Sequence, residues 1–146
     1  MSTKVETIHK FEQAVVWFLN GEGWDLEWAG NEYSHYDAIG RTPNGNKCVI
    51  EMKFRKTYYE DKMLEVYKYD KLMQLDPDIV KLYFVADPKG NYLFWLNKIQ
   101  LGGTQQMYCP KTTLWDSGKQ KKDVYLIPES LATICNFYNL TDLDNM

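Results

Sequence analysis

One turn and the strand that follows it constrain this chain most. The segment RTPNGNK, residues 41–47, contains Pro43-Asn44-Gly45, which suits a three-residue hairpin loop. Pro favours the first position of a type I turn, and Gly accepts the left-handed backbone that closes such a loop. The run NKCVIEMKFRK, residues 46–56, comes next and has the composition of a strand. The pattern predicts a hairpin in which this run pairs with the segment before the turn.

The two faces of the predicted strand differ in chemistry, because successive strand side chains point to opposite sides. One face is apolar: Cys48, Ile50, Met52 and Phe54. The other face sets an acid and two bases beside one apolar residue: Val49, Glu51, Lys53 and Arg55. The first face is expected to pack in the core. The second face suggests a functional site.

The loop length sets which residues stand opposite each other. With residues 43–45 in the loop, Thr42 pairs with Asn46, and Asp37 then lies opposite Glu51. Paired strand residues have Cβ atoms about 5 Å apart, so the two carboxylates would repel unless a cation lies between them. Mg²⁺ prefers such oxygen ligands. A loop one residue shorter or longer would instead place Met52 opposite Asp37 and turn Glu51 to the other face.

A helix is predicted near the N-terminus. Its apolar stripe is Val5, Ile8, Val15 and Leu19. Glu12 stands on the packed side of that stripe, within roughly 40° of Ile8 at 100° per residue. Burying an isolated carboxylate is expensive, so Glu12 either has a partner or reaches water at the edge of the core.

The remaining patterns predict a mixed sheet flanked by helices, in the α/β or α+β class. Strands are expected at residues 24–30, 36–40, 80–86, 92–96, 107–114 and 124–127. Helices are expected at residues 61–75 and after Pro128, and three tryptophans are expected in the core: Trp17, Trp24 and Trp28. We interpret residues 1–146 as one domain, in which residues 98–146 form a basic extension with a terminal helix.

Composition excludes several classes of protein. A chain of 146 residues with 45% hydrophobic residues can build one core. It has no apolar run of membrane-spanning length and no secretory signal, so we expect an intracellular protein that does not enter membranes. Three scattered cysteines and two histidines argue against a disulfide framework and a histidine zinc site. The net charge of −3 argues against non-specific coating of nucleic acid.

Asp37 followed by Glu51-Met52-Lys53 resembles the signature of the PD-(D/E)XK nuclease superfamily, in which an acid on one strand precedes an acid-x-Lys triplet on the next. Residues 5–86 are also similar to that family in their order of elements, α-β-β-β-α-β. Tyr36 stands where the family name has a proline. The alternative is an ordinary salt-bridge pair on an unrelated mixed fold.

The resemblance implies a metal-dependent nuclease. Asp37 and Glu51 would bind Mg²⁺, for which Mn²⁺ is expected to substitute, helped by the backbone carbonyl of Met52. Lys53 would orient the attacking water, and Glu12 would complete the site directly or through a water. Phosphodiester cleavage requires an activated water and neutralisation of the phosphate charge, which a metal and an adjacent ammonium supply.

The resemblance also implies that DNA is the partner. Candidate DNA contacts are Arg55, Lys56, Lys68, Lys71, Lys111, Lys119, Lys121 and Lys122. We expect a homodimer or a dimer of dimers, because symmetric cutting of two strands needs two sites. The acidic pI favours a double-strand endonuclease of the homing or restriction-like kind over a Holliday-junction resolvase. A non-catalytic nucleic-acid-binding or inhibitory protein on the same fold is a further alternative.

Overall fold

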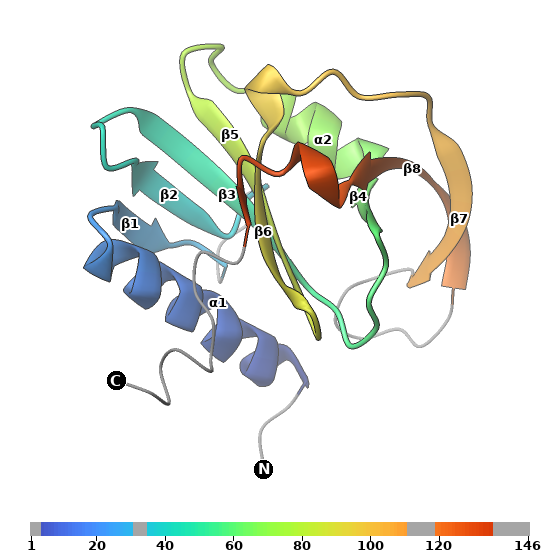
Figure 1. Cartoon of the computed structure of the whole chain (residues 1–146), viewed down its shortest axis with the longest axis horizontal. Coiled ribbons are helices and arrows are strands. Elements are labelled where there is room, and N and C mark those ends of the chain that lie inside the picture. Colours follow the sequence, from blue (N-terminus) through green and yellow to red (C-terminus); the bar gives the residue numbers. More distant parts are fainter. Residues whose placement is uncertain (1–3, 31–34, 111–118, 136–146) are drawn as a thin grey trace.

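A computed structural model of the chain describes residues 4–30, 35–110 and 119–135. Its main sheet has six strands in the spatial order β1-β2-β3-β5-β6-β9 (Figure 1). These strands are β1 Asp25–Trp28, β2 Ala38–Arg41, β3 Lys47–Phe54, β5 Val80–Asp87, β6 Gly90–Trp95 and β9 Ile134–Cys135. β3 and β5 run parallel, and the other neighbours in this sheet are antiparallel. The predicted mixed sheet is therefore confirmed.

The helix α1, Lys4–Gly21, covers one face of the main sheet. Val15 and Leu19 of α1 are buried against Ile50, Leu82 and Phe84 of the sheet. These sheet residues belong to the apolar side of β3 and to β5, the strand between β3 and β6. Because β5 is covered on both faces, its residues 82–86 are apolar without interruption, as expected for a central strand.

The opposite face of the main sheet is covered by a helix and a second, smaller sheet. The helix α2 spans Val66–Met73, and the second sheet has the order β4-β8-β7. Its strands are β4 Asp61–Glu65, β8 Lys119–Pro128 and β7 Gln105–Pro110. Leu64, Leu72 and Ile127 from this layer are buried with Tyr83 and Phe94 of the main sheet. The core is thus divided into two parts, one on each side of the sheet.

The hairpin between β2 and β3 has the predicted turn. The Gly45 φ angle is 86°, and its N–H donates to the Thr42 carbonyl at 2.8 Å. The Thr42 N–H donates to the Asn46 carbonyl at 2.9 Å, which sets Ala38 opposite Ile50. This register is the one that the three-residue loop predicts. The ladder ends at Ala38 and Ile50, so the predicted pairing of Asp37 with Glu51 is not part of it.

Three expectations about elements are wrong. Residues 61–65 form β4 rather than the start of a helix, because they pair with residues 124–128 of β8, a partner that local periodicity does not reveal. The helix expected after Pro128 is a single 3-10 turn, Glu129–Leu131, followed by β9, while residues 136–146 lie outside the described part. Trp17 is 76% exposed, whereas Trp24 and Trp28 pack against the core.

Two short 3-10 helices connect strands in the second half of the chain. One spans Leu96–Lys98 after β6, and the other is the turn at Glu129–Leu131. The predicted strand at 107–114 corresponds to β7, although residues 111–114 are outside the described part. In the described residues, no helix has the length and apolarity needed to span a membrane.

Candidate active site

An open edge of β3 positions the candidate site. β2 stops pairing at Ala38, whereas β3 continues to Phe54 alongside β5. Asp37 lies just beyond the last pair: its N–H donates to the Ile50 carbonyl, and its Oδ2 accepts the Met52 N–H, both at 2.8 Å. Because the N–H and C=O of a strand residue point to the same side, the Met52 carbonyl also faces this open edge.

Glu12 reaches the same edge from α1. Its side chain is buried, and its Oε1 accepts a hydrogen bond from the Trp28 indole Nε1 at 2.9 Å. The carboxyl groups of Glu12 and Asp37 are close enough to share a hydrogen bond. The predicted position of Glu12 on the packed face is confirmed, and the partners that it required are Trp28 and Asp37.

Gly30 leaves the space that this contact needs. A Cβ at residue 30 would lie 2.3 Å from Glu12 Oε1 and 2.6 Å from Trp28 Nε1. Neither distance is compatible with a carbon atom at that position. A glycine after β1 is therefore required by the hydrogen bond between Glu12 and Trp28.

Glu51 enters the site from β3 and is held by α2. Lys68 Nζ lies 3.2 Å from Glu51 Oε1 and 3.6 Å from Glu65 Oε2. Glu65 in turn accepts Lys122 of β8 at 2.8 Å. A chain of alternating charges therefore connects the second sheet to the candidate site.

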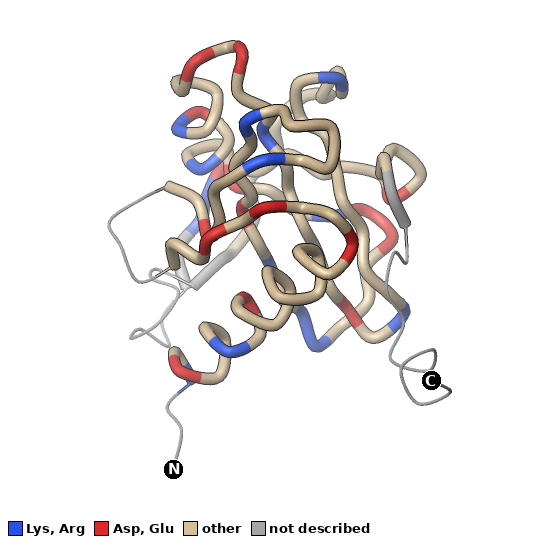
Figure 2. The backbone as a smooth tube through the Cα atoms, turned by 90° about the vertical axis from the view of Figure 1, so that its left-hand side faces the viewer, with Lys and Arg blue, Asp and Glu red and all other residues tan. Residues whose placement is uncertain are grey.

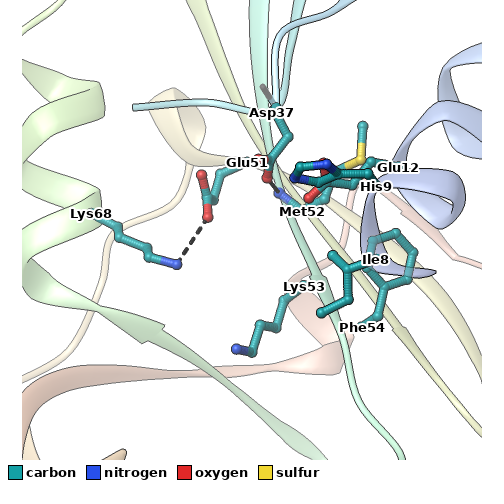
Figure 3. Close-up of a pocket in the computed structure, with 10 residues that line it drawn as sticks. Ile8, His9, Glu12, Asp37, Glu51, Met52, Lys53, Phe54 and Lys68 are labelled. Carbon is teal, nitrogen blue, oxygen red and sulfur yellow. Dashed lines mark hydrogen bonds and ion pairs between the residues drawn. The ribbon is translucent and has the colours of Figure 1, made fainter. Parts of the chain in front are cut away.

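These side chains line one small hollow of about 160 Å³ (Figure 3). The lining residues are Ile8, His9, Glu12, Gly30, Asp37, Glu51, Met52, Lys53, Phe54 and Lys68. The structure thus brings together Glu12, Asp37, Glu51 and Lys53, as the sequence predicted. Lys53 and Lys68 approach from the α2 side of Glu51, and Glu12 and His9 from the α1 side.

Burial and mutual repulsion change the acidity of the three carboxyl groups. Burial, together with the Asp37 carboxylate, raises the pKa of Glu12 to about 7. Burial also raises the pKa of Asp37, against the opposing effect of the Met52 N–H. Burial raises the pKa of Glu51 to about 8, although the Lys68 ammonium favours its charged form. Near neutral pH the cluster therefore retains protons that an added cation would displace.

The two lysines of the site, Lys53 and Lys68, differ in their pKa values. Burial, followed by the neighbouring cations Lys68 and Arg55, lowers the pKa of Lys53 to about 8. Burial also disfavours the charge of Lys68, but the carboxylates of Glu51 and Glu65 outweigh it and raise its pKa above the ordinary value. Lys68 is thus a permanent cation, whereas Lys53 can exchange a proton close to neutral pH.

The donors present suit a hard divalent cation. Glu12, Asp37 and Glu51 supply carboxylate oxygens, and the open edge supplies the Met52 carbonyl, which are ligands that Mg²⁺ prefers. Their raised pKa values follow from carboxyl groups gathered with little solvent, a cost that a divalent charge would offset. Among the described residues, no three His, Cys, Asp or Glu side chains are already arranged as a metal centre. Glu51 is bound to Lys68, so metal binding requires its side chain to adjust.

Two residues of the site were not predicted as functional. His9 lines the hollow, and its ring contacts Trp28 edge to face at a centroid distance of 5.0 Å. Its place in the sequence, one helical turn before Glu12, was a usable signal. Trp28 was assigned to the core alone, and only the fold reveals that its indole N–H reaches Glu12.

The candidate DNA contacts are spread over several elements. Arg55 and Lys56 follow β3, Lys68 is inside the site, and Lys71 lies over the Tyr67 ring at 5.5 Å. Lys121 is exposed on β8, Lys122 is paired with Glu65, Lys119 begins β8, and Lys111 lies outside the described residues. In the view of Figure 2, acidic and basic residues are interspersed along the backbone.

The layer order, with the carboxylate cluster at the β2–β3 edge, is similar to a PD-(D/E)XK nuclease-like fold. The structure is similar to that of Hjc, a Holliday junction resolvase from the archaeal hyperthermophile Archaeoglobus fulgidus. The similarity covers 93% of each chain with a TM-score of 0.55 and 14% sequence identity. No family model matches the sequence, and a search of curated proteins finds no match.

Proposed function

We propose that this protein is a divalent-metal-dependent DNA endonuclease that cleaves branched DNA. The proposal rests on one observation: a single hollow is lined by Glu12, Asp37, Glu51 and Lys53. These residues come from α1, the segment before β2, and β3, so their meeting depends on the whole fold. A surface salt bridge would not need three buried carboxyl groups with raised pKa values.

The proposed mechanism assigns a task to each side chain. A Mg²⁺ ion held by Asp37, Glu51 and the Met52 carbonyl would neutralise phosphate charge and lower the pKa of a water. Lys53 would hold that water and donate to a phosphate oxygen. Glu12, whose pKa burial raises to about 7, would accept a proton near neutral pH. Lys68 orients Glu51 through their ion pair.

Branched DNA is preferred over a homing or restriction-like site because of the similarity to a junction resolvase over nearly the whole chain. The sequence, because of its acidic pI, favoured a homing or restriction-like endonuclease over a junction resolvase. That argument weakens once the position of the cations is considered, because Lys53 and Lys68 lie inside the site itself. We propose further that the active form is a homodimer, or a dimer of dimers, with one site for each cut strand.

The test compares three substrates: supercoiled plasmid, linear duplex and a four-way junction, each with Mg²⁺ or with EDTA. We expect metal-dependent cleavage with a preference for the junction. Glu51→Gln should abolish cleavage and retain DNA binding, and Glu22→Gln, an exposed carboxylate on the loop after α1, is the matched control. Binding without cleavage of any substrate would favour the non-catalytic alternative. Full activity of Glu51→Gln would show that the site is elsewhere.

A further inference from the structure

A second hollow of about 550 Å³ lies beside the candidate active site. It is formed by the first half of α1 and by the chain that leaves β3 and β5. Its lining residues are Lys4, Thr7, Ile8, Phe11, Phe54, Arg55, Lys56, Ala86, Asp87 and Pro88. We call it the phenylalanine hollow. Ile8 and Phe54 line both this hollow and the active site, so the two are adjacent.

Two aromatic rings form an apolar wall in the phenylalanine hollow. Phe11 is 49% exposed, although it is one of the larger apolar side chains of α1. Its ring lies 5.6 Å from that of Phe54, and Phe54 lies 5.8 Å from the fully buried Phe84. Phe11 is therefore supported from below by the core while it remains open to solvent. Such a supported ring can stack on a flat, apolar ligand.

The charges around the hollow favour an anion. Lys4 and Lys56, which line the hollow, are both exposed. The acid in the lining, Asp87, is neutralised by Lys62 at 2.9 Å, and both side chains are 1% exposed. An aromatic wall with a cationic rim is the combination that binds single-stranded nucleic acid, by stacking the base and pairing the phosphate.

We propose that the phenylalanine hollow binds an unpaired nucleotide next to the cleaved phosphate. This inference rests on the proposed function and names the part of a branched substrate that the hollow takes, a nucleotide that is unpaired at the branch point. With the phosphate at Asp37 and Glu51, the adjacent hollow beyond Ile8 and Phe54 is within reach of the neighbouring nucleotide. The base stacks on Phe11, and the backbone lies near Lys4 and Lys56. Because every base has a stacking face, this recognition is independent of sequence.

The test uses two forked DNAs in EDTA, measured by fluorescence anisotropy. One fork has an ordinary unpaired arm, and the other has an arm of abasic nucleotides, which retains every phosphate and removes every base. We expect the wild type to bind the ordinary fork about tenfold more tightly, the effect of one or two stacked bases. Phe11→Ala should bind both forks equally, and Phe11→Trp should restore the preference. Trp17→Ala, exposed on the same helix, should behave as the wild type.

The outcomes separate this inference from the nuclease proposal. Cleavage activity in a protein that binds both forks equally would overturn the hollow and leave the proposed function intact. Loss of preference in Phe11→Ala would support the hollow even if no DNA were cleaved. Sedimentation measurements on the wild type and on Phe11→Ala test whether a second copy of the chain occupies the hollow instead. A change in oligomeric state with no preference in the wild type would make the hollow a contact between copies and overturn the proposal.

Discussion

Glu12 shows how one buried carboxyl group can be both costly and useful. It lies on the packed side of α1, accepts the Trp28 N–H, and is within hydrogen-bonding reach of the Asp37 carboxyl group. Each of these contacts satisfies an oxygen atom that burial has removed from water. The same burial raises its pKa, so the residue is held in a state that releases a proton when a cation arrives.

We expect Glu12→Gln to become more stable than the wild type as the pH rises in metal-free buffer. The folded wild type keeps a proton on Glu12 up to about pH 7, whereas the unfolded chain loses it near pH 4.5. The wild type therefore loses stability across this window, by at most about 3 kcal/mol, and the glutamine variant does not. Urea unfolding at pH 5 and pH 8 measures the difference. Glu22→Gln, at an exposed carboxylate, is the control variant. A stability difference between Glu12→Gln and the wild type that stays constant with pH would contradict the assigned burial.

Gly30→Ala should damage the site more than the fold. The new Cβ would collide with Glu12 Oε1 and the Trp28 indole, so both side chains must move. We expect weaker Mn²⁺ binding by calorimetry and a loss of about 1–3 kcal/mol in the free energy of unfolding, as in other overpacked positions. Gly102→Ala is the control, because nothing lies within 4 Å of its added Cβ. Unchanged Mn²⁺ affinity in Gly30→Ala would remove Glu12 from the metal site.

At the scale of elements, β4 carries a buried charge that ties the two sheets together. Lys62 is 1% exposed, and its ammonium contacts Asp87 at the end of β5 and Glu129 after β8. It also donates to the Tyr59 carbonyl and lies 4.2 Å from the centre of the Tyr92 ring. The strand pairing of β4 with β8 therefore places one lysine at the meeting point of both sheets.

Lys62→Met should destabilise the protein by about 3–5 kcal/mol, because it leaves Asp87 buried without a counter-charge. The double variant Lys62→Met with Asp87→Asn should recover part of this loss, since the unpaired charge is removed. Urea unfolding provides the measurement. Lys89→Met is the matched control: Lys89 lies 4.0 Å from the centre of the Tyr58 ring but is exposed, so its loss should cost little. If Lys62→Met were as stable as Lys89→Met, the loss of Lys62 would not leave Asp87 without a counter-charge.

Helices and strands whose pattern is set by their own burial were predicted correctly, whereas an element that depends on a distant strand was not. α1, β3 and β5 were predicted correctly because their periodicity records burial on one face or on two. Residues 61–65 were assigned to a helix because the stretch DKMLEVYKYDKLMQL reads as one continuous helical pattern. Their alternating burial, with Lys62 and Leu64 inside, depends on β8, some sixty residues later in the chain.

At the scale of the whole molecule, two sites must act together if both strands of a junction are to be cut. We expect mixed dimers of wild type and Glu51→Gln to nick one strand, because only one subunit retains its carboxylate cluster. The products on a supercoiled cruciform plasmid should shift from linear to nicked circles as the inactive subunit is added in excess. Linear products that decline without nicked circles would indicate that each subunit cuts both strands alone.

The sequence by itself determined the hairpin, its register and the presence of an acid on the packed stripe of the first helix. A turn of defined length sets strand pairing locally, and an alternating strand reveals its two faces. Only the tertiary structure decided that Trp28 and Gly30 serve Glu12, that Lys68 holds Glu51, and that β4 belongs to a second sheet. These contacts join residues brought together by packing, and the pattern of a single segment contains no information about its partner.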